Sequence, residues 1–147
     1  MNLDKLREEI ALDEGIKYEI YLDHLGLPTL GIGHLVRESD IEHGQPVGTP
    51  VTEERVIELF KGDILSVLAD CDRLYPEFET LPEEAQLIIA NMMFNMGYSR
   101  LSKFRMMKAA VEAGDWKEAA AQMKDSRWAR QVPNRADRLI KRMERLA

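Results

Sequence analysis

The sequence contains a single cysteine, Cys71, among its 147 residues. A chain with one cysteine cannot form an internal disulfide framework, so nothing in it requires an oxidising compartment. It also lacks an apolar run of the length, about 20 residues, that spans a bilayer. Its first fifteen residues hold five acidic side chains where a signal peptide needs an apolar stretch. These absences predict a soluble protein made in a cytoplasm and not inserted into a membrane.

The composition is that of a globular protein, with 45% hydrophobic and 31% charged residues. Residues 1–147 are expected to form one domain with a sizeable core. A net charge of −6 argues against a general nucleic-acid binder, which would be basic overall. The charge is unevenly distributed, because residues 1–84 hold 7 basic and 20 acidic side chains and residues 85–147 hold 13 and 6. The C-terminal part therefore either attracts an anionic partner or is a solvated helical surface.

The hydrophobic pattern divides the N-terminal half into three segments. Apolar residues at helical spacing predict a first helix over 1–14, ended by Gly15. Residues 15–51 are rich in glycine and proline and predict a small β-containing lobe. A connecting helix over about 52–72 follows, capped by Thr52 and with an apolar stripe formed by Val56, Phe60, Ile64, Val67 and Cys71.

The remainder, about 73–147, predicts a helical lobe. The segment from Pro82 to Gly97 is apolar almost all round, which is typical of a buried central helix. Further helices are expected over 101–113, from a capping box at Asp115 and Glu118, and from Asn134 onward. The predicted fold class is α+β, a small β-hairpin-containing lobe joined by a long helix to an all-α lobe.

Several kinds of site are absent from the sequence. The three histidines, His24, His34 and His43, lie in turn-rich segments without zinc-ligand spacing, so neither a metal nor a cofactor is expected. There is no phosphate-binding glycine-rich loop and no G-x-S-x-G nucleophile motif. Cys71 lies on the apolar stripe, which favours a buried structural thiol over a nucleophile.

Carboxylates remain as candidates for chemistry. Glu14 ends the first helix, Asp23 follows nine residues later in the turn-rich segment, and Thr29 follows after six more. This spacing alone is weak, because 26 acidic residues produce such pairs by chance. Two carboxylates on different elements that face one site are, however, the equipment of a glycoside hydrolase.

Several motifs occur in an order that resembles one known family. They are D-E-G (13–15), E-x8-D-x5-T (14–29), G-I-G-H (31–34), N-M-x-F-x-M-G (91–97), W-x-E-A-A (116–120), S-R-W (126–128) and P-N-R-A (133–136). Together they resemble the phage-type lysozyme (endolysin) family, in particular the T-even phage members. The resemblance covers nearly the whole chain and is weakest at 37–51 and at the last residues.

The resemblance implies a muramidase that hydrolyses the β-1,4 bond between N-acetylmuramic acid and N-acetylglucosamine in bacterial peptidoglycan, in a cleft between two lobes. By this resemblance Glu14 is the general acid, Asp23 assists the attacking water and Thr29 positions it. Members of this kind invert the anomeric centre, so the two carboxyl groups should lie about 6.5–9.5 Å apart.

The resemblance also implies supporting residues. Arg135 would pair with Glu14 and favour its charged form, whereas the helix end and burial would favour the protonated form. His34 would pair with Asp63 in a structural role. Leu35, Phe94 and Asn95 would line the saccharide site, although Phe94 on an apolar helix is equally a core residue.

Two further positions depart from the family pattern or fit it only loosely. Met107 and Gln122 stand where the family has polar sugar contacts, and a methionine cannot supply one. Trp116 and Trp128 are expected to pack in the core and not to bind sugar.

Three alternatives remain open at this point. A non-catalytic cell-wall-binding module would not need Glu14, a lytic transglycosylase would need only one acid, and a nucleic-acid module rests on the C-terminal charge alone. The leading hypothesis is a monomeric enzyme whose partner is peptidoglycan. It would accumulate in the host bacterial cytoplasm and reach the wall through a separate membrane-permeabilising protein.

Overall fold

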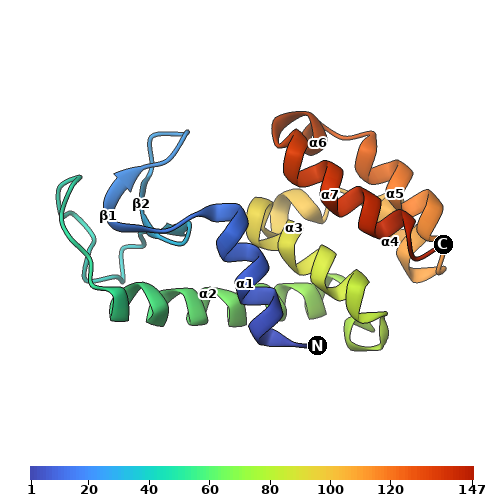
Figure 1. Cartoon of the computed structure of the whole chain (residues 1–147), viewed down its shortest axis with the longest axis horizontal. Coiled ribbons are helices and arrows are strands. Elements are labelled where there is room, and N and C mark those ends of the chain that lie inside the picture. Colours follow the sequence, from blue (N-terminus) through green and yellow to red (C-terminus); the bar gives the residue numbers. More distant parts are fainter. The chain divides into compact units, whose positions relative to one another are not determined.

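The computed structural model describes all residues from 1 to 147 and has an α+β architecture (Figure 1). The chain divides into two compact units, an N-terminal unit of residues 7–66 and a helical unit of residues 1–6 and 67–147. The α+β fold class is confirmed, with seven α-helices, a short 3₁₀ helix and one three-stranded sheet. No helix has the length and apolar character needed to cross a membrane.

The first helix, α1, spans Leu3–Glu14. Asn2 begins it, because its side-chain oxygen accepts a hydrogen bond from the Lys5 amide at 3.1 Å. Leu6 and Ile10 lie one turn apart and are fully buried. Gly15 ends the helix in a left-handed conformation, with φ of 73°, that residues with a side chain rarely adopt.

The sheet of the N-terminal unit consists of β1 (Lys17–Leu22), β2 (Pro28–Gly31) and β3 (His34–Leu35) in antiparallel order β1-β2-β3. Its buried side chains are the apolar Ile20 and Leu30 and the polar Thr29 and His34. Residues 36–52 return alongside β1, where the Val51 amide donates to the Tyr18 carbonyl at 2.9 Å. A single isolated β-bridge, between Glu19 and Pro50, also joins this segment to β1.

The long helix α2 spans Glu53–Leu74. Its cap is the expected one, since the Thr52 hydroxyl accepts from the Arg55 amide at 3.1 Å. Every residue of the expected apolar stripe is buried: Val56, Phe60, Ile64, Val67 and Cys71. After α2 a 3₁₀ helix, η1 (Phe78–Thr80), forms the break that the sequence predicts near 74–82.

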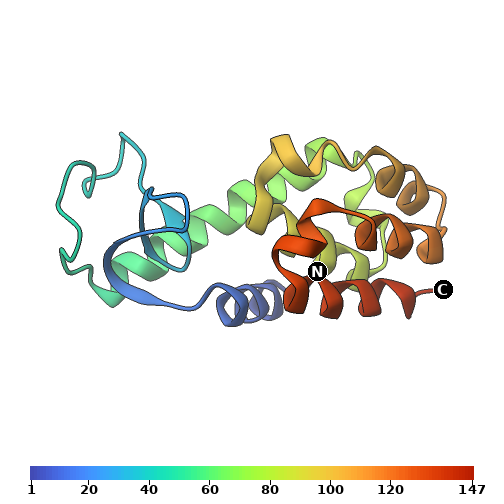
Figure 2. The same ribbon diagram turned by 90° about the horizontal axis from the view of Figure 1, so that it is seen from above.

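The helical unit is built around α3 (Glu83–Leu101), which is buried on nearly every side over its first fourteen residues. It is surrounded by α4 (Arg105–Glu112), α5 (Trp116–Lys124), α6 (Arg127–Gln131) and α7 (Pro133–Glu144). Helices α5 and α7 lie side by side in both views (Figures 1 and 2). Small buried residues on α5, Ala119 and Ala120, permit this approach.

The helices of this unit differ from the expectation at five places. Pro82 precedes α3 instead of lying in its first turn, and Gly97 interrupts the helix with φ of 79° before a last turn follows. Helix α4 begins at Arg105, four residues later than expected. The short helix α6 was not predicted, and Asn134 is not a cap because α7 already begins at Pro133. The Asp115 cap is present, accepting from the Glu118 amide at 3.2 Å.

Candidate active site

Glu14 is the last residue of α1 and lies three residues before β1. The Gly15 amide donates to the Ala11 carbonyl at 2.9 Å and closes the helix directly behind it. The left-handed turn at Gly15 then redirects the chain into the sheet. Glu14 therefore lies at the junction between the helix and the hairpin, as the sequence predicts.

Asp23 lies in the turn that follows β1, where backbone amides hold its carboxylate. Its Oδ1 atom accepts from the Leu25 amide at 2.8 Å and from the Leu27 amide at 2.9 Å. The hydrogen bond from Leu27 lowers the pKa of Asp23 most, and those from Leu25 and Gly26 and the nearby His24 act in the same direction against a smaller effect of burial. Asp23 is therefore held in its ionised form.

Thr29 lies on β2 with 4% of its surface exposed. Its hydroxyl donates to the Leu27 carbonyl at 2.9 Å, so the backbone of Leu27 binds the Asp23 side chain through its N–H and the Thr29 side chain through its C=O. The threonine proton is thereby engaged, and the Oγ1 lone pairs can accept a hydrogen bond. Asp23 Oδ2 accepts no hydrogen bond from the protein, so it too can accept one from another molecule.

Tyr21, which the sequence reasoning missed, lies close to both candidate carboxylates. It pairs with Thr29 across the two strands. Burial raises the pKa of the Tyr21 phenol, and the negative charges of Glu14 and Asp23 raise it further. The signal in the sequence was its position in β1, two residues before Asp23.

His34 is buried, 3% exposed, between two carboxylates. Its Nδ1 atom lies 2.6 Å from Asp63 Oδ2, the pair that the resemblance implied, and its Nε2 atom lies 2.8 Å from Asp40 Oδ2. Burial lowers the pKa of His34, but the hydrogen bonds to the two carboxylates outweigh it and the pKa is raised. Asp40 was not singled out from the sequence, because its loop has no regular pattern.

A second buried ion pair adjoins this histidine. Glu42 is 5% exposed and accepts from Arg55 Nε at 2.9 Å and from Arg55 Nη2 at 3.0 Å. This two-pronged contact joins the loop to α2 and lowers the pKa of Glu42. Together with His34 it fixes the irregular segment after β3 to the helix.

The remaining predicted residues are divided between the units. Leu35 on β3 is 48% exposed and so is available for contact. Phe94 and Asn95 lie on α3 and are part-buried, and the Asn95 side-chain oxygen accepts from Trp128 Nε1 at 2.7 Å. Arg135 Nε on α7 donates to Asn91 Oδ1 at 2.8 Å. Glu14 and Arg135 belong to different units, so their pairing stays a prediction.

The structure also places Met107 and Gln122, the two residues at positions where the family has polar sugar contacts. Met107 is 1% exposed and belongs to the core of the helical unit. Gln122 donates to Glu118 at 2.8 Å along α5. Trp128 is buried, as expected, and Trp116 is part-buried. No group of three or more His, Cys, Asp or Glu side chains could hold a metal ion.

The N-terminal unit thus joins Asp23 and the buried Thr29 through the Leu27 backbone and has both candidate carboxylates acting on Tyr21. Two carboxylates on separate elements are the equipment of a glycosidase. Comparison with known proteins extends this assignment. The family model described as phage lysozyme matches residues 11–145, and the chain belongs to the phage lysozyme family. It is accordingly an enzyme of the lysozyme class, a glycoside hydrolase.

Three relatives illustrate the range of the family. Probable T4-type lysozyme 2 of Dictyostelium discoideum is 30% identical over 94% of this chain and 92% of its own length. The pre-baseplate central spike protein Gp5 of Enterobacteria phage T4 is 30% identical over 91% of this chain. Peptidoglycan hydrolase gp36 of Pseudomonas phage phiKMV is 31% identical over 93% of this chain. The chain spans only 26% of the spike protein and 15% of gp36.

Proposed function

We propose that this enzyme is a muramidase that hydrolyses the β-1,4 bond between N-acetylmuramic acid and N-acetylglucosamine of bacterial peptidoglycan. The family and the relative named peptidoglycan hydrolase support the substrate. The observation that carries the mechanism is that the backbone of Leu27 binds both the Asp23 carboxylate, through its N–H, and the Thr29 hydroxyl, through its carbonyl. That arrangement favours a site built to bind a water molecule.

In the proposed reaction the water donates one hydrogen bond to Asp23 Oδ2 and the other to Thr29 Oγ1. Both acceptors are open on the protein side, because Oδ1 is bound by two amides and the threonine proton by a carbonyl. A water held by both protons directs its lone pair away from them, toward the anomeric carbon. Asp23 takes up the proton of the water as the new C–O bond forms.

Glu14 acts from the other side of the bond as the general acid. It donates its proton to the glycosidic oxygen, so that the leaving sugar departs as an alcohol. The ionised Asp23 stabilises the positive charge that develops on the ring. The water attacks opposite the leaving group, and the product therefore has the inverted, α configuration.

The matched test compares wild type with Glu14→Gln and with Glu8→Gln. Glu8 is an exposed acid on the same helix and serves as the control. Clearing of outer-membrane-permeabilised Gram-negative cells should be lost in Glu14→Gln and retained in Glu8→Gln. Equal clearing by all three, or by none, would refute the proposed function. Anhydro ends on the released muropeptides would instead identify a lytic transglycosylase.

We also propose a role in host-cell lysis, in which the enzyme accumulates in the bacterial cytoplasm and reaches the wall through a separate membrane-permeabilising protein. Two relatives are phage proteins, one of them named a peptidoglycan hydrolase, which supports a role in a phage's attack on the wall. Expression inside a bacterial cell should lyse it only when a membrane-permeabilising protein is expressed together with the enzyme. Lysis without that second protein would contradict the proposed route.

A further inference from the structure

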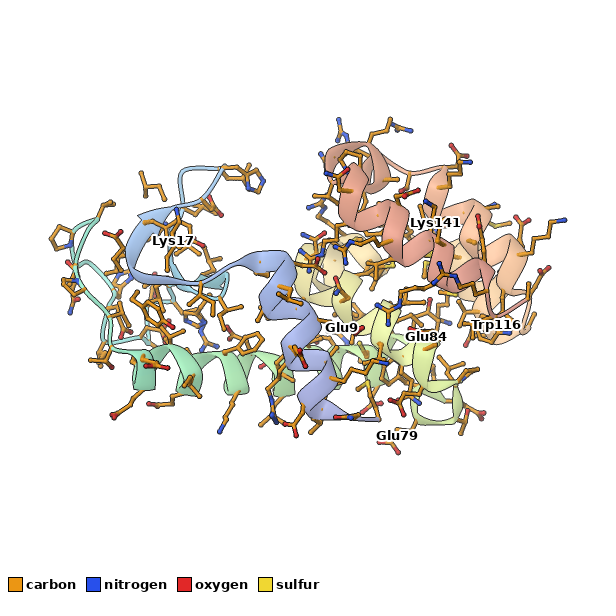
Figure 3. The ribbon with its side chains drawn as sticks, in the orientation of Figure 1. Glu9, Lys17, Glu79, Glu84, Trp116 and Lys141 are labelled. Atoms are coloured by element: carbon orange, nitrogen blue, oxygen red, sulfur yellow. The ribbon has the colours of Figure 1, made fainter.

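One face of β1 carries two side chains that the proposed mechanism leaves unused, Lys17 and Tyr21. The Lys17 ammonium lies 4.3 Å from the centroid of the Tyr21 ring, a cation–π contact. Figure 3 shows Lys17 on this strand. Tyr21 is directly opposite Thr29 in the register of β1 and β2, and side chains of paired residues lie on the same face of a sheet. The Tyr21 ring thus contacts a cation, and its side chain lies on the same face of the sheet as the threonine of the candidate site.

The phenol hydroxyl of Tyr21 makes no hydrogen bond with the protein. The Tyr21 residue as a whole is part-buried. Glu14 and Asp23 both act electrostatically on this phenol, which places it within range of the two groups that flank the scissile bond. Because its pKa is raised, the phenol stays protonated and keeps a proton to donate.

A neutral donor suits this place better than a charged one. The two carboxylates need opposite protonation states, one acid and one base, and a third charge would disturb that difference. A phenol adds a hydrogen bond without adding charge. Saccharides present hydroxyl, ring and amide oxygens that can accept such a bond.

We propose that Tyr21 is a substrate-contacting residue at the reacting sugar, to which its phenol donates a hydrogen bond, and that Lys17 positions the ring for this contact. The inference rests on the proposed muramidase function and adds a residue to its site. The acceptor oxygen loses electron density as positive charge develops on the sugar ring, so the contact is no stronger in the transition state than in the ground state and contributes mainly to substrate binding.

The first experiment compares Tyr21→Phe with Tyr18→Phe. Tyr18 is a 48% exposed tyrosine on the same strand and is the matched control. Loss of one neutral hydrogen bond should raise KM for solubilised peptidoglycan about 2- to 12-fold, with a smaller change in kcat. The thermal midpoint should match that of wild type, because Tyr21→Phe removes only the unpaired hydroxyl. A KM for Tyr21→Phe equal to that of Tyr18→Phe would overturn the proposal.

The second experiment tests Lys17 through a double-mutant cycle. Lys17→Met keeps the aliphatic stem and removes the cation. We expect it to raise KM in the wild-type background and to have no effect in Tyr21→Phe, because Lys17 acts only by holding the hydroxyl in place. Additive effects in the double mutant would overturn the positioning role.

The outcome for Tyr21 is separable from the outcome for the muramidase itself. If wild type releases muropeptides and Glu14→Gln does not, the proposed function stands and the Tyr21 comparison is decisive. If wild type releases none, both the proposed function and the role of Tyr21 are refuted.

Discussion

Replacement of Asp40 with asparagine tests the buried histidine pair in the N-terminal unit. Asp40 Oδ2 accepts two hydrogen bonds, from the Arg37 amide at 2.8 Å and from His34 Nε2 at 2.8 Å. Asparagine has nearly the same volume, so the substitution removes the charge without opening a cavity. Asp63 remains on the other nitrogen of the ring.

The magnitude follows from the charge state of the pair. A hydrogen bond between charged groups contributes about 1.5–3 kcal/mol to stability, whereas a bond between neutral groups contributes about 0.5–1.5 kcal/mol. While His34 is protonated, Asp40→Asn should therefore lower the free energy of unfolding by about 1.5–3 kcal/mol. Once His34 is neutral, the loss should fall to about half of that.

The pH dependence has a definite sign. The pKa of His34 is raised above its ordinary value of 6.5, so its contribution to stability is complete below that pH and is lost as the pH rises through the raised value. The pKa of Asp40 is lowered, because the hydrogen bonds from Arg37 and His34 outweigh the effect of burial. Its contribution is present above the ordinary value of 3.8 and is lost as the pH falls through the lowered value. The pair stabilises the fold most between these two ordinary values.

The assay is urea unfolding followed by circular dichroism, at about pH 5.5 and about pH 9, on either side of the histidine titration. Glu38→Gln, an exposed acid in the same loop, is the control and should change stability by less than about 0.5 kcal/mol. A loss in Asp40→Asn that is equal at both pH values, or grows with pH, would refute the reasoning. So would a loss no larger than that of Glu38→Gln.

Three further predictions concern single positions. Gly31→Ala should lower the free energy of unfolding by about 2–5 kcal/mol, because φ is +60° and the new Cβ would lie 2.9 Å from Val56 Cγ1. By contrast, the Cβ of Gly62→Ala in the interior of α2 meets nothing within 4 Å, so this substitution should raise the free energy of unfolding by about 0.5–1 kcal/mol. Chemical denaturation measures both free energies, and equal effects of the two substitutions would contradict the geometry. Cys71 is fully buried and burial raises its pKa to about 12, so a thiol reagent such as Ellman's should react only with unfolded chains, and fast labelling of the native protein would contradict this.

The fold was predictable wherever local pattern and burial agree. The stripe on α2 was readable because a helix with one buried face repeats every three to four residues, and Val56 to Cys71 follow that repeat. The α6 helix was not, since five residues are too few for periodicity and its cap depends on the Ser126 hydroxyl accepting from the Ala129 amide. Asn134 was mistaken for a cap because Pro133 starts α7 without needing one.

The site was predictable to the extent that one motif contains it. Glu14, Asp23 and Thr29 stand in a single stretch of sequence, and the hairpin brings the last two onto the backbone of one residue, Leu27. Asp40 was not predicted, because its contact with His34 forms only when the loop after β3 folds back, and no local sequence pattern indicates that fold. Tyr21 escaped notice because its meaning depends on strand register.

The most direct test of the proposed mechanism is the anomeric configuration of the first product. Proton NMR during a short digestion of soluble peptidoglycan fragments separates the α and β reducing ends before they equilibrate. The mechanism with Glu14 as acid and Asp23 guiding the water predicts that the α-anomer appears first and that Glu14→Gln produces neither anomer. Initial formation of the β-anomer, which requires a covalent intermediate, would contradict it.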